Sequence, residues 1–102
     1  MIDLTTIKTL LRYSDWANDQ LARAAAGLTP EQLDKGFDIG LGSFRKTLLH
    51  VLAGETVWLK RWQGELETPW PNEDEPAPPA DIGVRFSSNA RRRDAFVNSI
   101  SP

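Results

Sequence analysis

His50 is the only histidine in the chain, and it lies in the segment TLLHVL at positions 47–52. An imidazole can ligate a metal or act as a general base, so this residue is the first candidate for chemistry. On a helical wheel at about 100° per residue, His50 falls off the centre of the apolar stripe, on a flank shared with Gly54 and Arg61. Zinc sites take three or four ligands, and the sequence has neither an HxxxH nor an HExxH pattern. Spacing alone therefore favours a histidine at the rim of the helix over a metal ligand.

Glu55 is the second candidate, because the same rotation puts it near the middle of the apolar stripe, between Leu52 and Leu59. A carboxylate at such a position is costly to bury unless it is paired or hydrogen-bonded. The favoured interpretation is a structural carboxylate that is bonded to the first helix. Its candidate partners there are Arg12, Tyr13 and the indole Nε1 of Trp16. The alternative is a carboxylate that orients a metal-ligating histidine.

The other aromatic and charged side chains favour structural over chemical roles. A set of aromatic residues is predicted to lie in the core, with ligand stacking as the alternative; its members are Tyr13, Trp16, Trp58 and Trp62. Asp15 and Asn18 are expected to be solvated, although either could be an oxygen ligand. The only basic run is Arg91-Arg92-Arg93. Three consecutive arginines on a helix point in different directions, which predicts a solvated face rather than a basic stripe.

Composition limits the classes of function. The chain has 102 residues, which is typical of a single domain spanning 1–102. A formal net charge of −2 is too small to indicate a nucleic-acid or membrane-surface partner. The absence of cysteine excludes disulfides and cysteine-ligated zinc. Residues 1–11 lack the apolar core of a signal peptide, and no apolar run approaches the roughly 20 residues that cross a bilayer. We therefore expect a cytoplasmic protein.

Three long segments must position these side chains. Apolar residues recur at three- and four-residue steps, which predicts helices at about 4–26, 43–63 and 80–100. Asn89 and Arg93 interrupt the apolar stripe of the last of these helices. Shorter signals lie between the first two: Thr29 favours a helix start, and the glycines of the following segment favour a loop.

The connector at 69–79 contains five prolines, which indicates an extended surface segment that Trp70 could anchor. Three amphipathic helices with such connectors predict an all-α fold, an up-down helical bundle. Because the apolar stripes are broad, such a bundle favours four helices. The missing side of the bundle is therefore expected to be completed by a partner chain.

Three stretches resemble a known family. Positions 13–21 read Y-x-x-W-A-N-x-x-L, positions 42–51 read G-S-F-x-x-T-L-x-H-V, and positions 55–62 read E-x-x-W-L-x-R-W. In this order and spacing they resemble the DinB-like family of metalloenzymes, which includes YfiT-like proteins. The resemblance covers about 4–64 well and the third long helix loosely, so it concerns the N-terminal portion of the family.

The resemblance implies a four-helix bundle of up-down-down-up type, of which this chain carries three helices. It also implies a divalent metal, zinc or nickel, that is held by three histidines. His50 matches the first of these ligands, and an HxxxH pair on a later helix supplies the other two. Some relatives are S-transferases that use bacillithiol, mycothiol or glutathione, and others resemble metal-dependent hydrolases. A low-molecular-weight thiol is therefore a further implied partner.

Because no second histidine is present, the family's metal site cannot form within one copy, and the metal can be absent from this chain. We therefore expect a truncated chain and consider two hypotheses. For the parental gene we favour a metal-dependent enzyme, in which His50 is the first ligand and Glu55 supports it. For the 102 residues themselves we favour an inactive helical domain that forms a homodimer or a higher homo-oligomer through its apolar stripe.

Overall fold

The computed structural model describes residues 3–37, 40 and 42–100, and every regular element in these ranges is an α-helix. The helices are α1 (Leu4–Ala26), α2 (Pro30–Asp34), α3 (Phe44–Trp62) and α4 (Pro79–Ser99). The predicted all-α fold is therefore confirmed. No helix in the described ranges has the length and apolar character needed to cross a bilayer.

Local capping groups explain where the helices begin. The side chain of Asp3 accepts a hydrogen bond from the Thr6 amide at 2.8 Å, and the Ser43 hydroxyl accepts one from the Lys46 amide at 3.1 Å. Each cap satisfies an amide that has no partner within the first helical turn. The connector ends one residue earlier than expected, because Pro79 is the first residue of α4. Proline suits this position, since the missing N–H would have no helical partner there.

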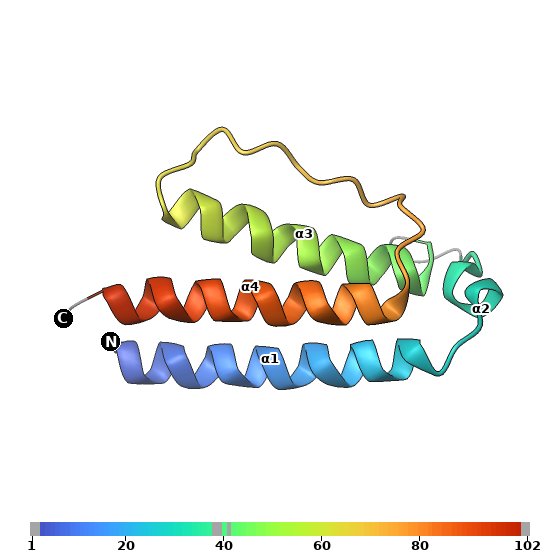
Figure 1. Cartoon of the computed structure of the whole chain (residues 1–102), viewed down its shortest axis with the longest axis horizontal. Helices are drawn as coiled ribbons and strands as arrows, with labels where there is room; N and C mark the ends of the chain where they lie inside the picture. Colours follow the sequence, from blue (N-terminus) through green and yellow to red (C-terminus); the bar gives the residue numbers. More distant parts are fainter. Residues whose placement is uncertain (1–2, 38–39, 41, 101–102) are drawn as a thin grey trace.

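The three long helices follow an up-down-down order (Figure 1). Helices α3 and α4 run in the same direction, and α1 runs opposite to both. A long connector makes this order possible by carrying the chain back along α3 to the start of α4. Helix α4 packs most extensively against α1 and also against α3, whereas α1 and α3 contact each other sparsely. The gap between α1 and α3 is thus the open side of the bundle.

The core lies where α3 and α4 meet the end of the connector, at Ala77, and the end of α1, at Ala25. Leu48 and Leu52 of α3 pack there with Ile82 and Phe86 of α4. Each buried side chain of this size contributes about 1.5–3 kcal/mol to the free energy of unfolding. The apolar stripe predicted for α3 is therefore buried only on the side that faces α4.

The aromatic set does not form part of this core, and that prediction is wrong. Tyr13, Trp16, Trp58 and Trp62 are between 50% and 67% exposed. The reason is geometric, because Trp58 and Trp62 lie on the open side of α3 that faces α1, and no described element covers the rings of Tyr13 and Trp16. Tyr13 and Trp16 contact each other with ring centroids 5.9 Å apart, and the Arg61 guanidinium lies over the Trp58 ring at 5.1 Å.

Candidate functional site

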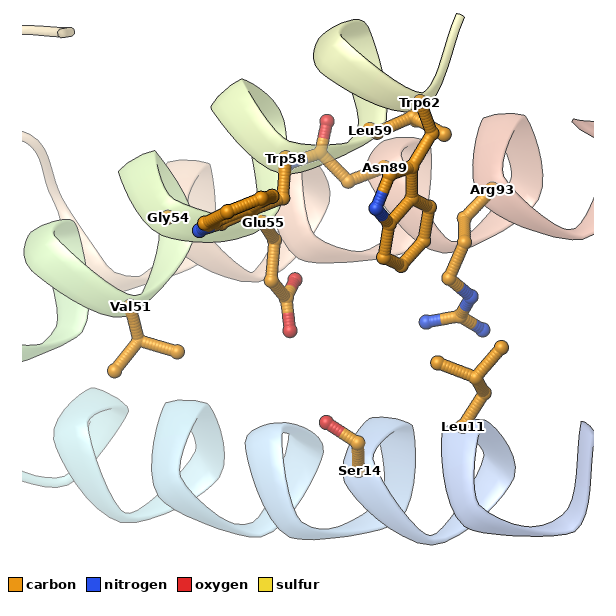
Figure 2. A pocket seen from close by; sticks show the side chains of 10 residues that line it. All are labelled: Leu11, Ser14, Val51, Gly54, Glu55, Trp58, Leu59, Trp62, Asn89 and Arg93. Atoms are coloured by element: carbon orange, nitrogen blue, oxygen red, sulfur yellow. The ribbon is translucent and has the colours of Figure 1, made fainter. Parts of the chain in front are cut away.

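A groove lies between α1 and α3, with α4 as its floor (Figure 2). It encloses a cavity of about 330 Å³ whose walls are mostly apolar. Its side walls are formed by Leu11 and Ser14 of α1 and by Val51, Trp58 and Trp62 of α3. A concave apolar surface with a few polar groups is the usual form of a binding site. We refer to this feature as the α1–α3 groove.

Glu55 extends from α3 into the α1–α3 groove (Figure 2). Its Oε1 accepts a hydrogen bond from Asn18 Nδ2 at 2.7 Å. Burial raises the pKa of the Glu55 carboxyl, while the Asn18 hydrogen bond and the positive charge of Arg93 act in the opposite direction. The predicted bond to the first helix is thus present, but its donor is Asn18 rather than Arg12, Tyr13 or Trp16. Asn18 is buried, which corrects the expectation that it is solvated.

Arg93 lies on the floor of the groove and is also buried, contrary to the expectation of a solvated arginine. Its Nη1 and Nη2 donate to the two carboxylate oxygens of Asp15 at 2.7 and 2.6 Å, and Nη2 also donates to Asp94 at 2.8 Å. These hydrogen bonds, with Asp15 first, raise the pKa of Arg93. Its Nε is buried and has no hydrogen-bond partner among the described residues. Arg93 thus joins α4 to α1 rather than facing solvent.

Asn89, the other polar residue predicted to interrupt the stripe of α4, is also buried and paired. Its Nδ2 donates to Thr56 Oγ1 of α3 at 2.8 Å. Asn89 and Arg93 therefore link α4 to both of its neighbours. Buried polar groups of this kind are retained because each finds a partner.

His50 lies outside the groove, on the side of α3 that faces the connector. Its Nδ1 lies 2.6 Å from Glu73 Oε1, and the indole Nε1 of Trp70 donates to the same oxygen. The rings of His50 and Trp70 have centroids 5.5 Å apart. The Trp70 hydrogen bond, followed by that of His50, lowers the pKa of Glu73, so this carboxyl is ionised at neutral pH. A neutral His50 would then donate through Nδ1 and keep the lone pair of Nε2 available.

Sequence reasoning missed Glu73, although it named Trp70 as an anchor of the connector. The only sequence signal for Glu73 is that it lies, like Trp70, in an extended, proline-rich segment that must return along α3. His50 and Glu55 do not meet in this arrangement, because His50 is bonded to Glu73 and Glu55 to Asn18. Among the described residues, no three histidine, aspartate or glutamate side chains converge closely enough to hold a metal ion.

Comparison with known proteins supplies the context for this site. No curated protein and no solved structure matches the chain significantly. A family model described as "DinB family" matches residues 1–89, a range that contains the α1–α3 groove walls, the connector and the first half of α4. This chain therefore belongs to the DinB family.

Proposed function

We propose that the chain supplies one ligand, His50, to a divalent-metal site of the kind that the DinB resemblance implies. The observation that supports this is the contact between His50 Nδ1 and Glu73 Oε1 at 2.6 Å. Metal-binding histidines almost always donate their second ring nitrogen to a carboxylate or carbonyl, which fixes the orientation of the ring. Glu73 would hold His50 in this way, and Trp70 would hold Glu73.

Among the described residues, His50 can fill one ligand position of such a site. The remaining ligand positions have no donor there. Zinc and nickel sites need further nitrogen, sulfur or oxygen donors, and no cluster of three such side chains is formed in the described ranges. The other donors would have to come from a further helix or from another copy. We therefore assign no reaction step to the metal. The transferase or hydrolase chemistry remains what the resemblance implies.

Metal titration of the purified chain tests this proposal. Because each chain supplies one ligand, we expect Zn²⁺ or Ni²⁺ to bind at micromolar concentration in calorimetry with one metal shared between two or three copies, and binding to be lost in His50→Ala. Glu73→Gln should weaken binding by about 10–100-fold, because it removes the group that orients the ring. Glu67→Gln, which neutralises an exposed carboxylate in the segment that follows α3, should bind as the wild type does. Lack of binding at micromolar metal, or equal binding by His50→Ala, would contradict the proposal.

A second candidate function is assembly without catalysis, in which the chain acts as a helical docking module. The open α1–α3 groove favours it, because an apolar groove edged by the half-exposed Trp58 and Trp62 is typical of an interaction surface. The homodimer predicted from the sequence is one such assembly. Light scattering over a dilution series tests it, and a well-folded monomer at high dilution would contradict the homodimer.

A further inference from the structure

One charged group stands out in the otherwise apolar wall of the α1–α3 groove. Glu55 lies on α3 between Val51 and Trp58, with its carboxylate directed towards α1 (Figure 2). Oε1 is occupied by Asn18, and no donor among the described residues bonds Oε2. Covering the groove with a purely apolar surface would remove the water that solvates Oε2 of Glu55 and would supply no hydrogen-bond donor in its place. Burial of this kind is costly for a carboxylate.

The charges around Glu55 do not supply the missing donor. Among the residues that the structure describes, Arg93 is the only cationic side chain that lines the groove, and its Nη1 and Nη2 are already bonded to Asp15 and Asp94. Asp15 and Asp94 thus take up the hydrogen bonds of Arg93 and leave Glu55, the one acidic side chain that lines the groove among the described residues, without a bonded cation. A group that docks here gains most if it brings a positive charge.

The exposed apolar surface is longer than a small ligand would need. Leu10 and Leu21 are 57% and 42% exposed, and at about 100° per residue both lie within about 40° of Ser14 on the wheel of α1. They are separated by about 16 Å along the helix axis, at 1.5 Å per residue. Trp58 and Trp62 extend the opposite wall along α3. The shape is that of a groove between two helices, which an α-helix fills by packing its side chains between theirs.

We propose that the α1–α3 groove binds an amphipathic α-helix of a partner that presents one arginine or lysine, within its apolar stripe, to Glu55. The apolar stripe would cover the two walls, and the basic group would bond Oε2 of Glu55. The flanking rings of Trp58 and Trp62 would contact the stem of the basic side chain. This inference rests on the second candidate function and names the chemistry of the occupant.

A second copy of the chain fits this surface less well. A two-fold interface places the same patch on both partners, so two concave grooves would face each other and leave space unfilled. It would also bring the two Glu55 carboxylates towards one interface, where like charges oppose each other. A single basic helix avoids both costs.

Two synthetic helical peptides test the proposal. Both have 18 residues with a leucine and alanine stripe; one carries arginine at the centre of the stripe, and the other carries citrulline, an uncharged analogue of the same shape. Binding is followed by tryptophan fluorescence and by amide chemical shifts of α1 and α3. We expect the arginine peptide to bind the wild type about 10-fold more tightly than the citrulline peptide, as for a charge-assisted hydrogen bond.

The matched protein variants locate the effect. Glu55→Gln keeps an acceptor for Asn18 and should reduce the preference for arginine to less than about 2-fold. Glu67→Gln removes an exposed carboxylate in the segment that follows α3 and should keep the full preference. Because the peptide pair is first compared on the unchanged wild type, a folding defect in a variant cannot decide the result.

The outcomes distinguish a failure of the basic contact to Glu55 from a failure of helix docking as a whole. Equal binding of both peptides to the wild type, or a preference that survives in Glu55→Gln, would overturn the basic helix while leaving the docking function intact. If neither peptide binds, the docking of a helix fails as well. A stable dimer in which Trp58 and Trp62 become protected, and from which neither peptide displaces a copy, would also overturn the inference and support the homodimer instead.

Discussion

Arg93 of α4 and Asp15 of α1 are 78 positions apart in the sequence and form a two-pronged ion pair in the structure, with N–O distances of 2.7 and 2.6 Å. The pair lies beside the α1–α3 groove and fixes α1 against α4 at mid-length. The Arg93 side chain is only 10% exposed and that of Asp15 31%. Loss of one partner would therefore leave a charge in a poorly solvated place.

We expect Asp15→Ala to lower the free energy of unfolding by about 3 kcal/mol, because Arg93 keeps its charge and loses its main partner. Urea unfolding followed by circular dichroism measures the change. The double variant Asp15→Leu/Arg93→Met should recover most of the loss, since it removes both charges and keeps the volume. A loss below about 0.5 kcal/mol, as seen for exposed ion pairs, would show that the pair is not structural.

The Asn89–Thr56 hydrogen bond makes a second prediction. Thr56→Val should lower the free energy of unfolding by about 1–3 kcal/mol, because it leaves the buried Asn89 amide without its acceptor. Thr56→Ser keeps the hydroxyl and is the matched control, which should remain much closer to the wild type. Thermal unfolding of the three proteins provides the comparison. Equal losses in Val and Ser variants would assign the effect to packing rather than to the hydrogen bond.

Arg45 connects three segments and makes a third prediction. It is buried, its Nε donates to Asp34 of α2 at 2.9 Å, and its Nη1 donates to the Ala77 carbonyl in the connector. Arg45→Lys should cost about 2 kcal/mol, because a single ammonium cannot reach both partners with the same geometry. Hydrogen exchange should then become faster in α2 and in the connector.

The control for this prediction is Arg23→Lys. Arg23 pairs with Asp19 on the exposed side of α1, with side-chain exposures of 76% and 54%. An exposed pair of this kind contributes little, so the free energy of unfolding should change by less than about 0.5 kcal/mol. Similar losses in both variants would contradict a special role for Arg45.

Glu55 makes a prediction about pH. Burial raises the pKa of its carboxyl in the folded chain, so the folded state binds its proton more tightly than the unfolded state does. The stabilising effect of this tighter proton binding is complete below the unfolded pKa, near 4.5, and is lost as pH rises through the folded pKa. Glu55→Gln should therefore be more stable than the wild type at pH 7, and this advantage should shrink at pH 4.

Urea unfolding at the two pH values measures this difference. Glu67→Gln serves as the control for net charge, because the Glu67 carboxylate is exposed in the segment that follows α3. If the stability advantage of Glu55→Gln over the wild type were larger at pH 4 than at pH 7, the predicted pH dependence would be wrong. It would mean that the hydrogen bond from Asn18 outweighs the cost of burying the carboxylate.

The helices could be predicted from sequence because their signals are local. A cap such as Asp3 or Ser43 acts within one turn, and an apolar stripe repeats within a few turns. The sequence pattern does not show which element covers an apolar stripe. The stripe containing Trp58 and Trp62 has the helical period of a core face, yet both rings are half exposed, because burial depends on a neighbour that periodicity does not specify.

The polar part of the site was harder to predict for a related reason. Arg93 and Asn89 break the apolar pattern of α4, and a short window assigns such residues to solvent. Their partners, Asp15 and Thr56, lie on other helices, so only the packed fold shows that they are buried and paired. The contact of His50 with Glu73 could not be predicted either, because an extended connector has no repeating apolar pattern from which its path can be inferred.

The packing of α1 chiefly against α4 affects how the chain can be made. Residues 27–78 separate the two helices, so during translation α1 leaves the ribosome long before its main partner exists. Asp15 cannot meet Arg93 until most of α4 has emerged, and closing so long a loop slows folding. The apolar side of α1 therefore stays without its main packing partner until α4 has been synthesised, and α1 can reach its folded position only after that point.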